Sequence, residues 1–226
     1  MTAHCVWGQA INHGPLDGLG FDAFCANPDT GVFALSDGAN SCPDSGKAAK
    51  WLCEHVTQPP EPEQDTLNFE PLVRGLHQDM LQRFPDTAAT LIGLHLAPWG
   101  LRLVSVGDSE LTVFERRLWG RWDKRHTMPK DLDDLGHPSQ LLASEVLNTV
   151  HQHDIPRKKA LLVLMMSDGP ARVLSESSVL RAIEKLSQQP PSSDDLNYLC
   201  ENLANEALAL GCHDDVSVVL IWIRYE

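Results

Sequence analysis

The chain has 226 residues, of which 42% are hydrophobic, and this length suits one large domain or two small ones with a sizeable core. Its formal net charge of −13 argues against a general affinity for nucleic acid or for anionic membranes. Six scattered cysteines without a CxxC pair, no membrane-length apolar run and no signal-like start predict a reduced, cytoplasmic protein whose cysteines pack in the core rather than bind zinc.

Short runs rich in Val, Leu, Ile and Thr alternate along the chain with amphipathic segments that have helical spacing. In chain order, these patterns predict a strand at residues 32–35, helices at 45–56 and 70–84, strands at 90–96, 101–106, 111–114 and 161–166, helices at 177–186 and 194–211, and a strand at 216–223. Gly211 is the expected C-cap of the last helix.

The connections between these segments favour an α+β fold over an α/β fold. The sequence APWG at residues 97–100 suits a hairpin, and GDSE at residues 107–110 predicts that the antiparallel meander continues into the next strand. The Pro-rich acidic stretch at residues 57–65 predicts a surface linker, and residues 124–138 are polar and are expected to be irregular.

Aspartates stand at the ends of several predicted strands. Asp37, Asp108 and Asp168 each follow a strand, whereas Asp214 and Asp215 precede one. Side chains in strand-end loops are held in place by the rigid strands, and carboxylates that converge there repel one another unless cations bind between them. Oxygen ligands prefer hard ions such as Mg²⁺ or Mn²⁺. The alternative for each aspartate is ordinary turn chemistry, because Asp-Gly and Gly-Asp are common turn dipeptides.

Six short blocks, in this order, resemble the metal-dependent (type 2C) family of serine/threonine protein phosphatases: GFDAF, FALSDGAN…SGKAAKWL, DTAATLIGL, LRLVSVGDSEL, LLVLMMSDGPARVL and HDDVSVVLI. Together they extend from about residue 10 to residue 223. The resemblance implies a single domain over residues 1–226 with a four-layer α-β-β-α sandwich, in which two antiparallel sheets are flanked by helices.

The resemblance also implies an activity and its setting. The chain would hydrolyse phosphoserine and phosphothreonine in proteins with water activated by two Mn²⁺ or Mg²⁺ ions, a third and looser ion being an open alternative. Its partners would be phosphorylated proteins such as a Ser/Thr kinase or that kinase's targets, and the chain would act as a monomer in a bacterial cytoplasm. The rival reading is a pseudophosphatase, in which the same fold serves as a regulatory binding module.

The family's metal ligands fall on six positions of this chain: Asp22, Asp37, Gly38, Asp108, Asp168 and Asp214. By resemblance, Asp37 bridges the two ions, and Gly38 contributes its carbonyl oxygen. Asp168 and Asp214 each hold one ion. Asp22 acts nearby, mostly through bound water, and Asp108 matches a residue that helps to hold a third ion in some members.

The chain departs from the family pattern at several places, and two of them bear on the candidate site. The N-terminal block lacks the arginine that often grips the substrate phosphate, so His13 is a candidate for that catalytic role; the alternative is a histidine in a surface loop. Arg172 stands four residues after Asp168, where members with a third metal tend to have a second aspartate, and this argues against a stable third ion.

Overall fold

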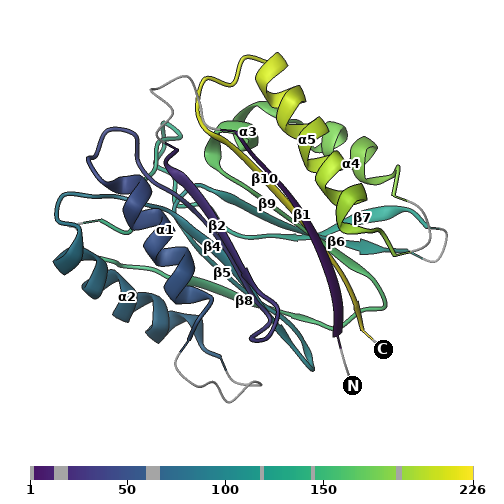
Figure 1. The fold of residues 1–226 in the computed structure, drawn as a ribbon, viewed down its shortest axis with the longest axis horizontal. Coiled ribbons are helices and arrows are strands. Elements are labelled where there is room, and N and C mark those ends of the chain that lie inside the picture. The colour runs from purple at the N-terminus through teal and green to yellow at the C-terminus, as the bar shows by residue number, and fades with distance from the viewer. Residues whose placement is uncertain are drawn as a thin grey trace. The chain divides into compact units, whose positions relative to one another are not determined.

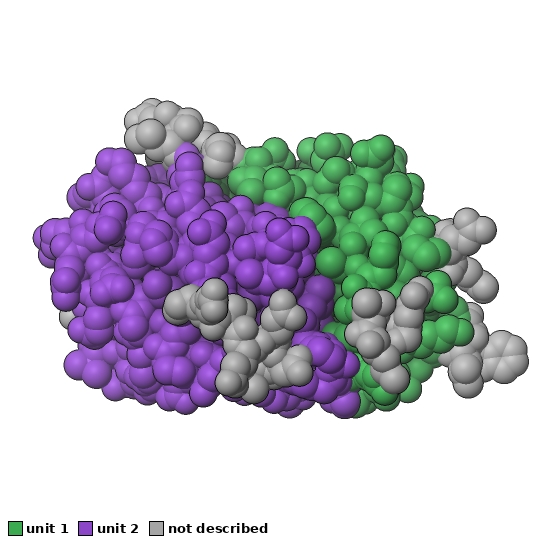
Figure 2. Space-filling view, turned by 60° about the horizontal axis from the view of Figure 1, so that its bottom comes forward, with its two compact units in different colours: residues 1–18, 110–127, 157–226 green, residues 19–109, 128–156 purple. Residues whose placement is uncertain are grey.

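A computed structural model describes residues 3–12, 20–59, 67–117, 120–143, 146–186 and 190–225. The chain divides into two compact units, shown in different colours in Figure 2. Unit 1 comprises Met1–Gly18, Glu110–Thr127 and Arg157–Glu226, and unit 2 comprises Leu19–Ser109 and Met128–Pro156. Each unit contains one five-stranded antiparallel sheet and its own helices.

In unit 2, the sheet has the strand order β2-β3-β4-β5-β8. Its strands are β2 (Asp22–Asn27), β3 (Val32–Asp37), β4 (Leu91–Ala97), β5 (Gly100–Val106) and β8 (His151–Pro156). Helices α1 (Ser45–Val56) and α2 (Phe69–Arg83) lie beside one another against this sheet (Figure 1). The core of unit 2 lies between the sheet and the helices. There, Val32, Ala34 and Val104 of the strands pack in one buried cluster with Leu52 and Val73 of the helices.

In unit 1, the sheet has the strand order β1-β10-β9-β6-β7. Its strands are β1 (Ala3–Asn12), β10 (Val216–Tyr225), β9 (Leu161–Met166), β6 (Glu110–Arg116) and β7 (Trp122–Thr127). The helices are α3 (Asp168–Val173), α4 (Glu176–Ile183) and α5 (Ser193–Ala209), and α5 lies along β1 and β10 (Figure 1).

Helix α5 covers the sheet of unit 1 because its apolar residues recur at helical spacing. Its buried residues are Leu196, Leu199, Cys200, Leu203, Ala204 and Ala207. The helix begins in a capping box, in which the Ser192 hydroxyl accepts from the Asp195 backbone N–H while the Asp195 carboxylate accepts from the Ser192 backbone N–H. It ends before Gly211, whose φ of 88° is a left-handed conformation that glycine adopts without strain.

The α+β class, with two antiparallel sheets flanked by helices, is confirmed. All six predicted strands and all four predicted helices are present, within a few residues of the expected bounds, and APWG forms the β4–β5 hairpin. Most of the predicted linker at residues 57–65 lies outside the described part of the chain. No helix of the described residues is both long and apolar enough to cross a membrane.

Two predictions about connections were wrong. The GDSE segment does not continue a meander, because β5 and β6 belong to different sheets and the segment carries the chain from one sheet to the other. Residues 124–138 are not irregular throughout, because β7 includes the first four of them and pairs with β6. Four strands, β1, β2, β7 and β8, and the short helix α3 were not predicted.

Gly8 in β1 allows the close approach of α5. The Cys200 thiol donates to the Gly8 carbonyl at 3.3 Å, and a Cβ atom at residue 8 would overlap the backbone of Leu196 and Asn197. We expect Gly8→Ala to lower the free energy of unfolding by about 1–3 kcal/mol or more, because the helix must move off the strand.

The matched control is Gly75→Ala in α2, where no atom lies within 4 Å of the added methyl group. This change should leave the free energy of unfolding unchanged or raise it by about 0.5–1 kcal/mol, because alanine favours a helix interior over glycine. Urea denaturation monitored by circular dichroism measures both. Equal effects of the two changes would show that the contact between β1 and α5 is not tight.

Candidate functional site

Two of the candidate ligands in unit 2 face each other across neighbouring strands. Asp22 begins β2, Asp37 ends β3, and the two residues are direct partners in the antiparallel register. Asp22 is 8% exposed, and Asp37 is half-buried. Like charges directly opposite each other destabilise a sheet. Carboxylate oxygens are the ligand type that a hard divalent cation prefers, so this pair is a candidate for binding one.

Glycines bring the backbone close together beside this carboxylate pair. The Gly38 N–H donates to the Phe21 carbonyl at 3.0 Å, which joins the residue after Asp37 to the residue before Asp22. A Cβ atom at residue 38 would lie 2.6 Å from the carbonyl carbon and oxygen of Ser45, at the start of α1. Residue 38 therefore has to be glycine, because a side chain there would overlap the backbone of Ser45.

Thr90 connects Asp37 to the loop that carries Asp108. The Asp37 N–H donates to Thr90 Oγ1 at 3.1 Å, and the Thr90 N–H donates to the Asp37 carbonyl at 2.8 Å. The Thr90 hydroxyl also lies 2.7 Å from the hydroxyl of Ser109. Asp108 precedes this serine and is 5% exposed. Thr90 was predicted only as the first residue of a strand, and nothing in its sequence context marks it as a link between two candidate ligands.

We expect Thr90→Val to lower the free energy of unfolding by about 1–3 kcal/mol, because the buried Asp37 N–H and Ser109 hydroxyl each lose a hydrogen-bond partner. Thr90→Ser retains the hydroxyl group and should cost less than half as much. Chemical denaturation of both variants provides the measurement. A threonine-to-valine change without effect would mean that other groups replace these hydrogen bonds.

In unit 1, Asp168 is the first residue of α3, directly after β9. Its Oδ2 atom lies 2.7 Å from Nη2 of Arg172, one helical turn later; the aspartate side chain is 15% exposed and the arginine side chain 56% exposed. Ser167 anchors this point, because its hydroxyl accepts from the Ser217 N–H at 3.1 Å and its own N–H donates to the Ser217 carbonyl at 3.2 Å. The end of β9 is thereby fixed to the start of β10.

The loop before β10 lies against the start of α3. A Cβ atom at Gly169 would lie 2.6 Å from the Asp215 carbonyl oxygen and 3.1 Å from Cβ of Asp214. The structure thus brings the Asp168 and Asp214 segments together, as the sequence predicted. One carboxylate oxygen of Asp214 accepts from the Asp215 N–H at 2.9 Å, and Asp215 itself is buried.

Cys212 also borders this segment, because its sulfur would lie 3.0 Å from a Cβ atom at Gly169. Burial raises the pKa of the Cys212 thiol above its ordinary value, and the nearby carboxylates of Asp214 and Asp168 act in the same direction. A thiol with a raised pKa stays protonated at neutral pH and is a poor nucleophile. This cysteine therefore packs rather than reacts.

The candidate ligands come from both units: Asp22, Asp37, Gly38 and Asp108 from unit 2, and Asp168 and Asp214 from unit 1. His13 lies outside the described residues. Within the described residues, no three or more His, Cys, Asp or Glu side chains form a group that could by itself hold a metal ion. The sequence did not reveal that Asp22 and Asp37 are cross-strand partners, since β2 was not predicted.

Comparisons with known proteins agree on one family. No curated protein matches the chain. Among solved structures, PppA of Pseudomonas aeruginosa, described as a key regulatory component of its type VI secretion system, gives a TM-score of 0.74 at 14% identity, covering 97% of this chain and 99% of that one. The serine/threonine phosphatase PstP/Ppp of Mycobacterium tuberculosis gives a TM-score of 0.72 at 19% identity, and the match covers 96% of this chain and 97% of that one.

The catalytic domain of PstP in complex with two manganese ions gives a TM-score of 0.70 at 20% identity, covering 99% of this chain and all of that one. At these identities the likeness shows the fold. The family model described as Protein phosphatase 2C matches residues 20–209, which include parts of both units. As the order of its sequence motifs predicted, the chain belongs to the protein phosphatase 2C family of metal-dependent serine/threonine protein phosphatases.

Proposed function

We propose that the chain hydrolyses phosphoserine and phosphothreonine in proteins with the help of two Mn²⁺ or Mg²⁺ ions. The observation that carries this proposal is the register of β2 and β3, which places Asp22 directly opposite Asp37. Family membership and the two manganese ions named for the PstP catalytic domain support the same choice of metal.

Each proposed ligand would have its own role. By the family pattern, Asp37 and the Gly38 carbonyl oxygen would hold the ions, and Asp168 and Asp214 would each supply one further carboxylate. Asp22 would act mainly through water and balance charge from the strand next to Asp37. When bound, the ions make a water molecule more acidic and neutralise charge on the phosphoryl oxygens. Asp22, as a hydrogen-bond acceptor on the neighbouring strand, would help to orient that water.

Arg172 favours a two-ion site over a three-ion site. Its guanidinium already provides a positive charge 2.7 Å from Asp168 Oδ2, so this carboxylate has less need of a further cation. We infer that any third ion is held loosely, and that the main role of Asp108 is to shape the loop after β5.

The phosphate of the substrate needs a donor, and we propose His13 for this role because no arginine occupies the N-terminal block. We expect His13→Ala to raise KM or lower kcat/KM about tenfold, equivalent to about 1.4 kcal/mol, with metal affinity little changed. Steady-state kinetics and a Mn²⁺ titration measure the two quantities. Unchanged kinetics would assign the histidine to a surface loop and leave the phosphate contact to Asn12 or a backbone amide.

The cellular setting follows from the chemistry. We infer a phosphoprotein substrate, with a Ser/Thr kinase or its targets as partners, and a monomer that acts as one domain over residues 1–226. All six cysteines are free thiols, and three of them, Cys53, Cys200 and Cys212, are buried, which suits a reducing cytoplasm.

The pseudophosphatase alternative is not favoured, because the carboxylates that the reaction needs are present at the ends of ordered strands. The direct test is release of inorganic phosphate from a phosphothreonine peptide in the presence of Mn²⁺. A folded, Mn²⁺-loaded chain that releases no phosphate from phosphoserine or phosphothreonine peptides would overturn the proposed function.

A further inference from the structure

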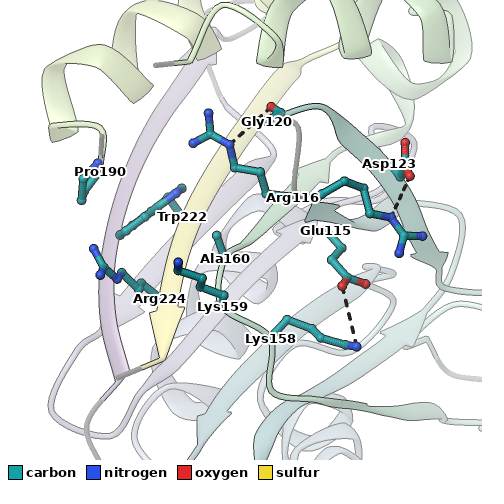
Figure 3. Close-up of a pocket in the computed structure, with 11 residues that line it drawn as sticks. Glu115, Arg116, Gly120, Asp123, Lys158, Lys159, Ala160, Pro190, Trp222 and Arg224 are labelled. Atoms are coloured by element: carbon teal, nitrogen blue, oxygen red, sulfur yellow. Dashed lines mark hydrogen bonds and ion pairs between the residues drawn. The ribbon is translucent and has the colours of Figure 1, made fainter. Parts of the chain in front are cut away.

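A basic cavity of about 920 Å³ lies in unit 1, at the opposite ends of the strands from Asp168 and Asp214 (Figure 3). It is formed by the end of β6, the β6–β7 connection, the segment before β9 and the end of β10. Five of its lining residues are basic: Arg116, Arg117, Lys158, Lys159 and Arg224. The two acidic lining residues are Glu115 and Asp123.

Both acidic side chains are already engaged by cations of the same cavity. Arg117 Nε lies 2.8 Å from Asp123 Oδ2, and Lys158 Nζ lies 3.7 Å from Glu115 Oε1 (Figure 3). These pairs neutralise one another and leave a positive surplus in the cavity. The local charge is therefore opposite in sign to the net charge of −13 that the whole chain carries.

After these two pairs, three of the five basic residues are left: Arg116, Lys159 and Arg224. Lys159 and Arg224 are exposed, and neither has an ion pair with any described residue. Both line the cavity together with Trp222 (Figure 3), which is 3% exposed and whose indole N–H has no hydrogen-bond acceptor among the described residues. Arg116 also lines the cavity, and its guanidinium Nε–H donates to the Gly120 carbonyl at 3.3 Å. A ligand bearing several negative charges would match this arrangement.

We propose that this basic cavity docks an acidic segment of the phosphoprotein substrate, at a distance from the phosphorylated residue. The inference rests on the proposed function. An acidic phosphoprotein is repelled by most of a chain with a charge of −13, so a local concentration of cations would decide where such a substrate makes contact. Docking would raise the effective concentration of the phosphorylated residue at the carboxylate site and so lower KM.

The strand geometry fixes how far apart the two parts of the substrate must be. Lys159 precedes Asp168 by nine positions, and Asp214 precedes Arg224 by ten. At about 3.3 Å per residue, the cavity lies roughly 30 Å from the candidate ligands of its own unit. A linker of about five residues, which spans at most about 18 Å, cannot connect the two. A Gly/Ser linker of about 25 residues, with a root-mean-square length of about 25–30 Å, can.

The first test is direct binding. A fluorescein-labelled, unphosphorylated peptide of about ten alternating Glu and Asp residues is titrated with the Mn²⁺-loaded chain, and its anisotropy is recorded. We expect Lys159→Glu/Arg224→Glu to weaken binding at least about tenfold. The matched control Lys50→Glu/Arg83→Glu, which changes the same charges on two exposed residues of unit 2, should weaken it less than about twofold. Equal weakening by both variants would overturn the proposal in favour of a general charge effect.

The second test is kinetic. Two phosphothreonine peptides carry the same acidic block of three Glu residues, one through a five-residue and one through a 25-residue Gly/Ser linker; the block is short enough that, with the five-residue linker, it cannot enter the cavity. We expect the long linker to lower KM about fivefold with kcat unchanged, and the Lys159→Glu/Arg224→Glu variant to abolish this difference. Equal KM values for the two linkers on the unmodified chain would overturn the proposal. Absence of phosphate release from either peptide, with binding of the acidic peptide retained at the cavity, would instead contradict the proposed catalytic function.

Discussion

Asp37→Asn and Asp168→Asn are each expected to lower kcat by about 100-fold or more while the chain stays folded. Each change keeps the shape of the side chain but removes one negative charge that the proposed metal site needs, so the affinity for cations falls and the attacking water becomes less acidic. Asp37→Asn also relieves the repulsion between two cross-strand carboxylates, and Asp168→Asn removes only a partly exposed ion pair. Phosphate release and circular dichroism together measure the effect.

The controls are Asp29→Asn, in the exposed turn between β2 and β3, and Asp194→Asn, in the exposed first turn of α5. Both remove the same charge outside the candidate site and should leave kcat within about twofold. If either of the two site variants retained near-full turnover, the corresponding residue would not be a metal ligand.

Removal of the metal ions by chelation should lower turnover at least as much as these two substitutions do. We expect EDTA to abolish turnover and added Mn²⁺ to restore it, since the carboxylates of Asp22 and Asp37 have no means of activating water without a cation between them. The measurement is the phosphatase rate before chelation, after gel filtration in EDTA, and after Mn²⁺ is added back.

Circular dichroism before and after chelation provides the control, because loss of activity must be separated from loss of structure. Activity that persists after exhaustive chelation would contradict the two-metal proposal, whereas activity lost together with the fold would make the metal structural. Neither result would alter the family assignment, which depends on the match over residues 20–209.

The strands that could be predicted from the sequence are the interior ones, and the strands that could not are the four edges. β3, β4, β5, β6, β9 and β10 have neighbours on both sides and consist largely of buried apolar residues. β1, β2, β7 and β8 stand at the sheet edges, and β7 and β8 are mostly polar, with sequences WDKRHT and HQHDIP. Polar side chains on edge strands prevent further pairing, so β7 and β8 lack the apolar pattern that identifies an interior strand.

The candidate site, too, could be predicted only where it adjoins interior strands. Asp37, Asp168 and Asp214 adjoin interior strands, so their placement at strand ends followed from the apolar runs beside them. The pairing of Asp22 with Asp37 did not follow, because it depends on the edge strand β2. Helix α3 was missed since its first turn contains Gly169 and Pro170, which are typical of turns.

The pairing of β1 with β10 in unit 1 also limits the order in which parts of this sheet can form. β1 is an edge strand whose neighbour in the sheet is β10, and the two pair from Ala3↔Tyr225 to Asn12↔Val216. About 200 residues therefore have to be synthesised between the two partners, so β1 lacks its sheet neighbour for most of synthesis. The β2–β3 and β4–β5 hairpins, which are local in sequence, can form earlier. Residues 216–225 insert between β1 and β9, and their arrival is the step that closes this sheet.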